Sequence, residues 1–401
     1  MFDQILIKRF QSLETPFYYY DLDLLDKTLR ACKSASDKYG FHVHYALKAN
    51  FNERILSAIE DLGFGADCVS GNEVKKAVET GFNPEKIVFA GVGKSDREIM
   101  DALDRNIFCF NVESIQELSV INDLAKQKNK IAKVAIRINP NVDAHTHQYI
   151  TTGLEENKFG INQWELPAFI EALKQSDHLD FIGIHFHIGS QITDLEVFKN
   201  LCFKVNEIHQ WFNEHGFQLK VLNVGGGLGV DYHHPDEHLV LDFENYFKIF
   251  DQFLERKPGQ EVHFELGRAL VAQCGSLISR ILYVKNGLKK NFLILDAGMT
   301  ELMRPALYHA YHKIENISSV KQAKSQISNL KSQCYKYDVV GPICESSDSF
   351  GKEVELPQSF RGDLIAIRTA GAYGEVMASG YNLRERVNSV YGTLIESERL
   401  N

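Results

Sequence analysis

Short β-branched and aromatic runs alternate with helical patterns eight times between residues 41 and 268, and this alternation limits the possible folds more than any other feature. The runs are FHVHYALKA, GFGADCVS, KIVFAGVG, NIFCFNVES, KVAIRINP, FIGIHFHIGS, KVLNVGGG and EVHFELGR. Amphipathic segments such as NERILSAIEDL and SIQELSVINDLAKQ lie between most of them. Strands that alternate with helices predict βαβ units and a parallel sheet, and eight units close naturally into a (β/α)8 barrel.

The pattern changes after Arg268. The segments LVAQCGSLISRILYVKN, NFLILDAG, YDVVGPIC and GDLIAIRTAGAYG are typical of strands joined by turns, with little helix. The opening TPFYYYDLD predicts another strand that has no partner in the barrel. We therefore expect an α/β barrel over residues 21–265 and a mainly β domain, similar to a sandwich or barrel, made of residues 1–20 and 266–401.

Composition and charge exclude several classes of function. The formal net charge of −9 argues against nucleic acid or an anionic membrane as a partner. The seven cysteines include no CxxC pair, and an odd number does not suit a disulfide framework. The start, MFDQILIKRF, does not resemble a secretory signal. We expect a reduced, cytoplasmic protein.

Polar residues gather where the predicted barrel strands end. In (β/α)8 barrels the chemistry occurs at the C-terminal ends of the strands, so these side chains are candidates for an active site. Most single residues of this kind are solvated or form structural hydrogen bonds, but so many at one end of a barrel favour a site. The candidates are Lys48, Asp67, Ser70, Lys94, Glu113, Arg137, Asn139, His185, His187, Ser190, Glu265 and Arg268.

The segment VGGGLG at residues 224–229 follows the seventh strand. Consecutive glycines let backbone N–H groups converge on an anion, and barrels often bind phosphate after strands seven and eight. A tight turn is the simpler explanation for a glycine triplet alone. The segment AGVGKS at residues 90–95 resembles a nucleotide P-loop, but Val88 stands where that motif requires glycine. We therefore favour a phosphate site at the glycine triplet.

Three pairs of histidines occur, as HTH (His145, His147), HFH (His185, His187) and HH (His233, His234). A barrel with H-x-H at a strand end can be a zinc hydrolase. That alternative needs carboxylate partners and leaves the glycine triplet without a role. His187 is also suited to lie flat against a planar cofactor, so we predict no metal site.

Lys48 ends a buried strand with an ammonium group, which needs a physical reason. Burial lowers the pKa of a lysine and makes its amine nucleophilic. With a phosphate nest and the carboxylate of Glu265 at the same end of the barrel, Lys48 could form a Schiff base with pyridoxal phosphate. The residues alone leave this as one of several possibilities.

The motifs, taken together in their order, resemble the fold-type III pyridoxal-phosphate decarboxylases. They are YALKAN, HFHIGSQ, NVGGGLG, ELGR, MRPALY, GPICESSD and AGAYG, and they extend over nearly the whole chain. Within that family the chain is most similar to the members that decarboxylate meso-diaminopimelate. Related alanine racemases share the barrel but carry an arginine where this chain has Glu265. The carboxylate of Glu265 therefore favours decarboxylation over racemisation.

The resemblance implies roles for particular residues. Lys48 would bind the pyridoxal 5'-phosphate covalently, His187 would stack on its ring and Glu265 would bond its pyridine nitrogen. The phosphate would be held by a larger group, comprising Ser190, Gly225, Gly226, Gly227, Gly267, Arg268 and Tyr373.

The resemblance also implies how the substrate is bound. Cys344 would return a proton to the reacting carbon, and Glu345 would bind the distal ammonium group. In this family a homodimer shares its active sites, so both residues would act in the partner subunit's site. The distal carboxylate would be bound by Arg268, Arg304, Tyr308 and Tyr373.

The expected reaction follows from this distal carboxylate. Decarboxylation of meso-2,6-diaminopimelate at its D-centre gives L-lysine and CO2, the last step of lysine biosynthesis. A bidentate arginine such as Arg304 suits a carboxylate at the far end of the substrate. Two alternatives stay open: a related decarboxylase of another diamino acid or carboxylated polyamine, and a non-catalytic binding protein. Such a binding protein would be expected to lose Lys48 or Cys344, and both are present.

Overall fold

The computed structural model describes residues 2–142, 158–318 and 334–392. Contacts divide the chain into two compact units. The barrel unit comprises residues 28–229 and 241–270, and the sheet unit comprises residues 1–27, 230–240 and 271–401. Among the described residues, no helix is both long enough and apolar enough to cross a bilayer.

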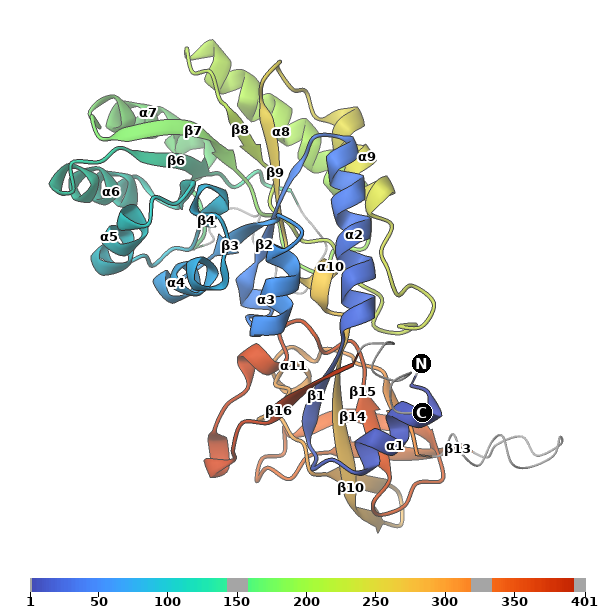
Figure 1. Cartoon of the computed structure of the whole chain (residues 1–401). Coiled ribbons are helices and arrows are strands. Elements are labelled where there is room, and N and C mark those ends of the chain that lie inside the picture. Colours follow the sequence, from blue (N-terminus) through green and yellow to red (C-terminus); the bar gives the residue numbers. More distant parts are fainter. Residues whose placement is uncertain (1, 143–157, 319–333, 393–401) are drawn as a thin grey trace. The chain divides into compact units, whose positions relative to one another are not determined.

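The barrel unit contains a closed barrel of eight parallel strands, which confirms the predicted fold class (Figure 1). Each strand pairs with the next along the chain, and β9 pairs with β2 to close the barrel. The strands are β2 (His42–Ala46), β3 (Gly65–Cys68), β4 (Ile87–Phe89), β5 (Cys109–Val112), β6 (Ala132–Arg137), β7 (Leu179–His185), β8 (Val221–Asn223) and β9 (Glu261–Leu266).

Helices connect the barrel strands and cover their outer face (Figure 1). Side-chain caps start several of them: Asn52, Ser70 and Ser114 each accept a hydrogen bond from a backbone N–H of the first turn. The helices are α2 (Leu22–Lys38), α3 (Glu53–Glu60), α4 (Gly71–Thr80), α5 (Asp96–Asp104), α6 (Ile115–Gln127), α7 (Leu166–Lys174), α8 (Glu196–Glu214), α9 (Phe243–Phe253) and α10 (Arg268–Val271).

Alternation along the strands separates an apolar outside from a more polar inside. Phe264 of β9 faces outward, with its ring centroid 4.9 Å from Phe247 and 4.8 Å from Phe250 of α9. Inside the barrel, an apolar cluster contains Cys109 and Val221. Two positions later on the same strands stand the amides Asn111 and Asn223. The interior therefore changes from apolar to polar toward the C-terminal ends of the strands.

The sheet unit is mainly β, as predicted. Its strands form the order β12-β15-β10-β11-β13-β14, and β1 (Phe17–Asp21) pairs antiparallel with β10 and parallel with β16. The N-terminal strand thus joins the C-terminal sheet. The remaining strands are β10 (Gly275–Asn286), β11 (Asn291–Leu295), β12 (Ile314–Asn316), β13 (Cys334–Val340), β14 (Ser349–Pro357), β15 (Leu364–Ile367) and β16 (Asn388–Gly392).

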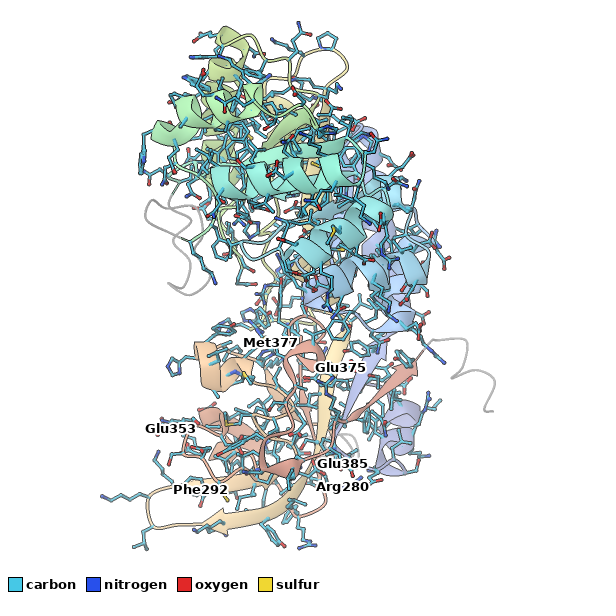
Figure 2. The ribbon with its side chains drawn as sticks, turned by 90° about the vertical axis from the view of Figure 1, so that its left-hand side faces the viewer. Arg280, Phe292, Glu353, Glu375, Met377 and Glu385 are labelled. Atoms are coloured by element: carbon cyan, nitrogen blue, oxygen red, sulfur yellow. The ribbon has the colours of Figure 1, made fainter. Side chains whose placement is uncertain are left out.

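The core of the sheet unit lies under helix α1 (Gln4–Gln11), and Phe10 of that helix packs on Phe17 and Tyr19 of β1. A second helix, α11 (Arg304–Tyr308), follows β11. Figure 2 shows the side chains of this unit, including Arg280 of β10, whose guanidinium donates to the Gly362 carbonyl at 3.0 Å. The aromatic run FYYY is therefore buried by sheet pairing and by α1.

Candidate active site

Lys48 lies immediately after β2, in the 3-10 turn η1 (Leu47–Ala49). Its Nζ is 3.8 Å from Oδ2 of Asp67, which lies on the neighbouring strand β3. The Lys48 side chain is 37% exposed, whereas that of Asp67 is 1% exposed. The ammonium group that ends β2 therefore lies at the C-terminal end of the barrel, beside a buried carboxyl group.

Glu265 of β9 is held on three sides inside the barrel. Its Oε1 accepts hydrogen bonds from the amides of Asn111 at 3.0 Å and Asn223 at 2.8 Å. Its Oε2 lies 3.0 Å from Nε2 of His185, whose buried Nδ1 has no hydrogen-bond partner among the described residues. The ring hydrogen of His185 is therefore on Nε2 and is donated to Glu265.

Electrostatics keep the Glu265 carboxylate ionised. Burial alone would raise its pKa, but His185, His187 and Lys48 outweigh this effect and hold the pKa well below its usual value. Asp67 behaves in the opposite way, since burial and then the charge of Glu265 raise its pKa to about 8 while Lys48 opposes the shift. The site thus contains one ionised and one protonated carboxyl group at neutral pH.

Asp67 also has a buried oxygen, Oδ1, that forms no hydrogen bond within the described residues. A buried oxygen of this kind costs free energy unless another group satisfies it. It lies on the strand next to that of Lys48, where a ligand of the lysine could bind. Asp67 is therefore a candidate for contact with a bound molecule.

His187 follows the end of β7. Burial, and then the charges of Lys48 and Arg137, lower its pKa well below the usual value. The ring is therefore neutral at physiological pH, which suits stacking on a planar ligand. The backbone N–H of Gly226 points at its Nδ1 over a long distance of 3.5 Å.

The glycine triplet is required by close backbone packing. An added Cβ at Gly226 would lie 1.8 Å from the Glu265 carbonyl oxygen, and one at Gly225 would lie 2.2 Å from the Phe186 carbonyl oxygen. Gly225 and Gly227 have φ of +71° and +103°, which favour glycine. The triplet therefore lets the turn pack directly against β9 and against the segment after β7.

Ser190 and Arg268 extend this turn. The Arg268 guanidinium donates to the Ser190 hydroxyl at 3.1 Å. Gly267, just before Arg268, packs so tightly that an added Cβ would lie 3.0 Å from the Cβ of Ala49. A cationic group, a hydroxyl and a glycine turn in one unit form a suitable binding place for a phosphate.

Other polar residues at the strand ends have structural partners. Arg137 forms a buried ion pair with Glu113 at 2.9 Å, and Lys94 pairs with Glu117 at 2.6 Å. Ser70 caps α4. Arg137, Glu113, Lys94 and Ser70, which the sequence indicated as candidates, therefore form structural contacts. His145 and His147 lie outside the described residues.

Asn111 and Asn223 are functional candidates that sequence reasoning missed. Each is an amide at a fully buried position of a strand, within CFNV and VLN. A buried polar residue in an otherwise apolar strand needs a hydrogen-bond partner, and this was the available signal. The partner, Glu265, is distant in sequence.

The sheet unit contains the remaining predicted site residues. Arg304 of α11 is buried, with Nη1 2.8 Å from Nε2 of His312 and the guanidinium carbon 4.9 Å from the ring centroid of Tyr232. His312 Nδ1 lies 2.9 Å from the Arg368 carbonyl oxygen, so Nδ1 donates and Nε2 accepts from Arg304. His312, which sequence reasoning also missed, thereby orients Arg304. Tyr308, half-buried, ends the same helix.

Cys344 and Glu345 lie on an exposed loop between β13 and β14. The Glu345 carboxylate accepts a hydrogen bond of 2.7 Å from Tyr381, and the Cys344 N–H donates to the side chain of Asn382. Tyr373 has a φ of +56°, an uncommon conformation for this residue type. The loop therefore presents a thiol and a carboxylate at the surface of this unit.

Comparisons with known proteins agree with this architecture. The model of the family described as pyridoxal-dependent decarboxylase, pyridoxal binding domain, matches residues 25–272. Diaminopimelate decarboxylase from Bacteroides thetaiotaomicron is 56% identical over 380 residues, covering 94% of this chain and 96% of that protein. Diaminopimelate decarboxylase from Helicobacter pylori strain J99 is 43% identical over 378 residues, covering 94% and 90%.

A solved structure agrees as well. The crystal structure of diaminopimelate decarboxylase from Helicobacter pylori complexed with L-lysine has a TM-score of 0.87 at 42% identity, over 96% of this chain and 93% of that one. Sequence and fold both match along nearly the whole chain. This protein therefore belongs to the pyridoxal-dependent decarboxylases, in the diaminopimelate decarboxylase family.

Proposed function

We propose that this enzyme decarboxylates meso-2,6-diaminopimelate at its D-centre and releases L-lysine and CO2, the last step of lysine biosynthesis. The observation that carries the proposal is the group around Glu265: an ionised carboxylate, a neighbouring lysine and a glycine turn at one end of a barrel. The relatives named diaminopimelate decarboxylases, at 56% and 43% identity, support the substrate.

The predicted cofactor-binding residues fit pyridoxal 5'-phosphate. Lys48 offers the amine, the glycine turn packs beside Glu265, and a buried oxygen of Asp67 forms no hydrogen bond within the described residues. The groups that would hold the phosphate are Ser190, Gly225, Gly226, Gly227, Gly267, Arg268 and Tyr373. Bound there, pyridoxal phosphate supplies an electron sink for the electron pair that the departing CO2 leaves behind.

Each residue then has a defined task. Glu265, kept ionised by its neighbours, would stabilise positive charge on a protonated pyridine nitrogen. His187, a neutral ring, would pack on the cofactor and exclude water. The three donors to Glu265 fix the carboxylate in one orientation, so it needs little reorganisation during the reaction.

The remaining predicted residues bind and protonate the substrate. Arg304 and Tyr308, with Arg268 and Tyr373, bind the distal carboxylate, and Glu345 binds the distal ammonium group. This binding energy orients the carboxylate that leaves. Cys344 donates a proton to the carbon that has lost CO2. His312 keeps the Arg304 guanidinium in place for this role.

We further propose a cytoplasmic homodimer in which Cys344 and Glu345 of each subunit serve the partner's site. Both side chains are exposed in the single chain, which leaves them accessible to another subunit. No nucleic acid or membrane is involved in this function.

Turnover with three substrates tests the assignment. The purified enzyme, loaded with pyridoxal phosphate, receives meso-diaminopimelate, ornithine or lysine, and CO2 and the amine product are measured. We expect CO2 and L-lysine from meso-diaminopimelate alone, because only this substrate has a distal carboxylate. Release from ornithine or lysine instead would contradict the role of Arg304. No release from any of the three would favour a polyamine substrate or a binding protein.

A further inference from the structure

A second cluster of side chains lies at the other end of the barrel from Lys48, where the first and last strands meet. His42 begins β2, and Glu261 and His263 lie at the start of β9. His42 and His263 are direct partners across the parallel pair that closes the barrel. The proposed decarboxylation uses none of these three residues.

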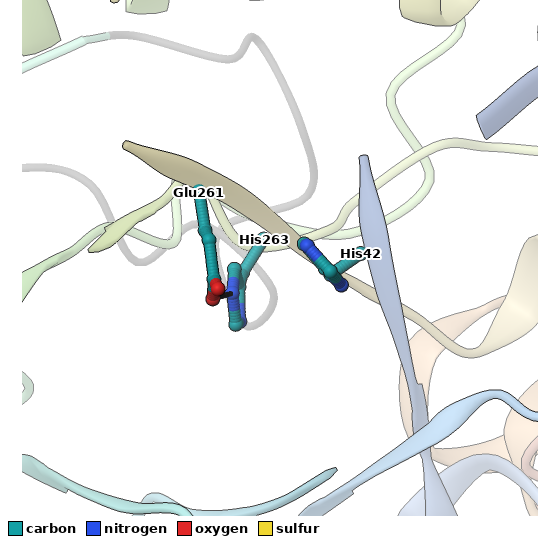
Figure 3. Close-up of side chains that lie close together, drawn as sticks. All are labelled: His42, Glu261 and His263. Atoms are coloured by element: carbon teal, nitrogen blue, oxygen red, sulfur yellow. Dashed lines mark hydrogen bonds and ion pairs between the residues drawn. The ribbon is translucent and has the colours of Figure 1, made fainter. Parts of the chain in front are cut away.

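The donor atoms of the three residues are close together. One nitrogen of each histidine and one carboxylate oxygen of Glu261 all lie within 4.8 Å of one another. Figure 3 shows His42 on one strand facing Glu261 and His263 on the other. The His263 side chain is 4% exposed and that of Glu261 is 48% exposed. The cluster is thus anchored on a buried imidazole and open to solvent on one side.

Hydrogen bonds determine which nitrogen of His263 is available. Nδ1 of the buried His44 lies 3.0 Å from the Lys86 carbonyl oxygen, which can only accept, so this nitrogen carries a hydrogen. Nε2 of His44 lies 2.8 Å from Nδ1 of His263 and accepts from it. The remaining nitrogen of His263, Nε2, is 2.9 Å from Oε2 of Glu261. A neutral His263 would therefore point a lone pair at a carboxylate oxygen.

The acceptor atoms Nε2 of His263 and Oε2 of Glu261, 2.9 Å apart, need a positive centre between or beside them. This centre is either a proton or a metal ion. The arrangement resembles a metal-binding histidine, whose other N–H is fixed by an outer hydrogen bond. His44 provides that outer bond, and the ring of Phe108 stacks on His263 with centroids 5.3 Å apart. Gly65 makes room for His44, because an added Cβ would lie 2.3 Å from its Nδ1.

Lys86, whose charge acts on His42, directs its ammonium group to a backbone carbonyl. The Lys86 ammonium donates to the Gly63 carbonyl oxygen at 3.0 Å. His42, at the exposed start of its strand, can turn to shorten its distance to the other two donors. Donors of a tetrahedral zinc centre lie about 3.3 Å apart, so an adjustment on the order of 1 Å is sufficient.

We propose that His42, Glu261 and His263 bind a divalent first-row transition ion. Two imidazoles and one carboxylate suit Zn2+, with water in the fourth position. Because the ligands come from β2 and β9, the ion links the strands that close the barrel. Its role is to stabilise the barrel, and it takes no part in the decarboxylation.

Zinc binding to the full-length enzyme loaded with pyridoxal phosphate tests the proposal. After chelator treatment, Zn2+ is titrated in competition with a chromogenic chelator. We expect one ion per chain in the wild type, and at least about tenfold weaker binding in His42→Asn and Glu261→Gln. Both side chains are exposed, so these variants should fold. His238→Asn, which removes an exposed histidine elsewhere, is the control and should bind as the wild type does.

Cobalt distinguishes this cluster from cysteine sites. Co2+ bound here should give visible bands without thiolate charge transfer, and His42→Asn should remove them. Thiolate bands, or binding that is equal in all variants, would assign the ion to another place and overturn the proposal. Absence of binding at micromolar Zn2+ would also overturn it.

Thermal unfolding provides a second readout. Zn2+ should raise the melting temperature of the wild type and of His238→Asn, but not that of His42→Asn, because an ion that binds only the folded state stabilises it. Turnover of His42→Asn should equal that of the wild type, with or without Zn2+. A loss of turnover on zinc removal in the wild type alone would contradict a purely stabilising role.

Discussion

At the scale of single residues, two buried carboxyl groups differ in charge because their neighbours differ. Glu265 accepts hydrogen bonds from three donors. Asp67 is buried near the negative charge of Glu265. The proposed function requires the first to stay ionised, so that it can stabilise a protonated ring nitrogen of the cofactor. The two groups give different predictions for pH and for substitution.

Lys48→Ala is predicted to lower turnover with meso-diaminopimelate by at least about a thousandfold, because no other residue supplies the amine that binds the cofactor. The absorption band of the lysine-bound cofactor should disappear as well. Lys204→Ala removes an exposed lysine of α8 and serves as the control. Normal turnover of Lys48→Ala with pyridoxal phosphate present would refute the assignment.

The raised pKa of Asp67 predicts that the stability of the folded protein depends on pH. Its folded-state pKa of about 8 lies above the unfolded value, so the folded state binds the extra proton between the two values. The resulting stability is fully present below the unfolded pKa and is lost as the pH rises through the folded pKa. Each pH unit within this window changes the free energy of unfolding by up to about 1.4 kcal/mol.

Urea unfolding of wild type and Asp67→Asn at pH 5, 6.5 and 8 measures this effect. Relative to the wild type, the variant should gain stability as the pH rises, because asparagine has no proton to lose. A difference that is constant with pH would show that Asp67 titrates normally.

At the scale of elements, the glycine turn after β8 lets two backbone segments approach closely. The Cβ of an alanine at position 226 would overlap the Glu265 carbonyl oxygen at 1.8 Å, so the turn and β9 cannot both keep their places. The turn is therefore expected to position both the anion site and the carboxylate.

Gly226→Ala should destabilise the protein by more than about 3 kcal/mol and weaken binding of pyridoxal phosphate. Gly259→Ala is the matched control: its φ is +84° but an added Cβ meets nothing within 4 Å. It should cost only about 1 kcal/mol, the strain of the backbone alone. Denaturant unfolding and cofactor titration separate the two results, and equal effects would contradict the packing argument.

At the scale of the whole molecule, the proposed dimer divides each site between two subunits. Cys344 and Glu345 are exposed on the loop after β13, whereas Lys48 and Glu265 belong to the barrel. A shared site predicts that two different inactive variants can complement each other.

Mixing Lys48→Ala with Cys344→Ala under conditions that exchange subunits should restore up to about a quarter of wild-type activity, because half of the dimers are then mixed and each has one intact site. Each variant alone, treated in the same way, is the control. No recovery, despite subunit exchange measured by mass, would place Cys344 in the site of its own subunit.

Much of the fold could be predicted from sequence because it depends on local patterns. Eight alternating strands and helices predicted the closed barrel, and the motifs predicted the family; both predictions are confirmed. The aromatic run at residues 17–20 had no barrel partner, and it pairs with β10 and β16 as expected. The residue roles stay predictions, which the experiments above test.

Periodicity and motif order in the sequence by itself determined the barrel, the second β domain and the family, since backbone propensity and burial act over a few neighbouring residues. Only the tertiary structure decided which polar residues meet. Asn111 and Asn223 converge on Glu265 from two different strands, whereas Lys94 and Glu113 are occupied by buried partners. His42, Glu261 and His263 also meet only where the barrel closes. Such contacts depend on strand register around a closed sheet, which no local pattern contains.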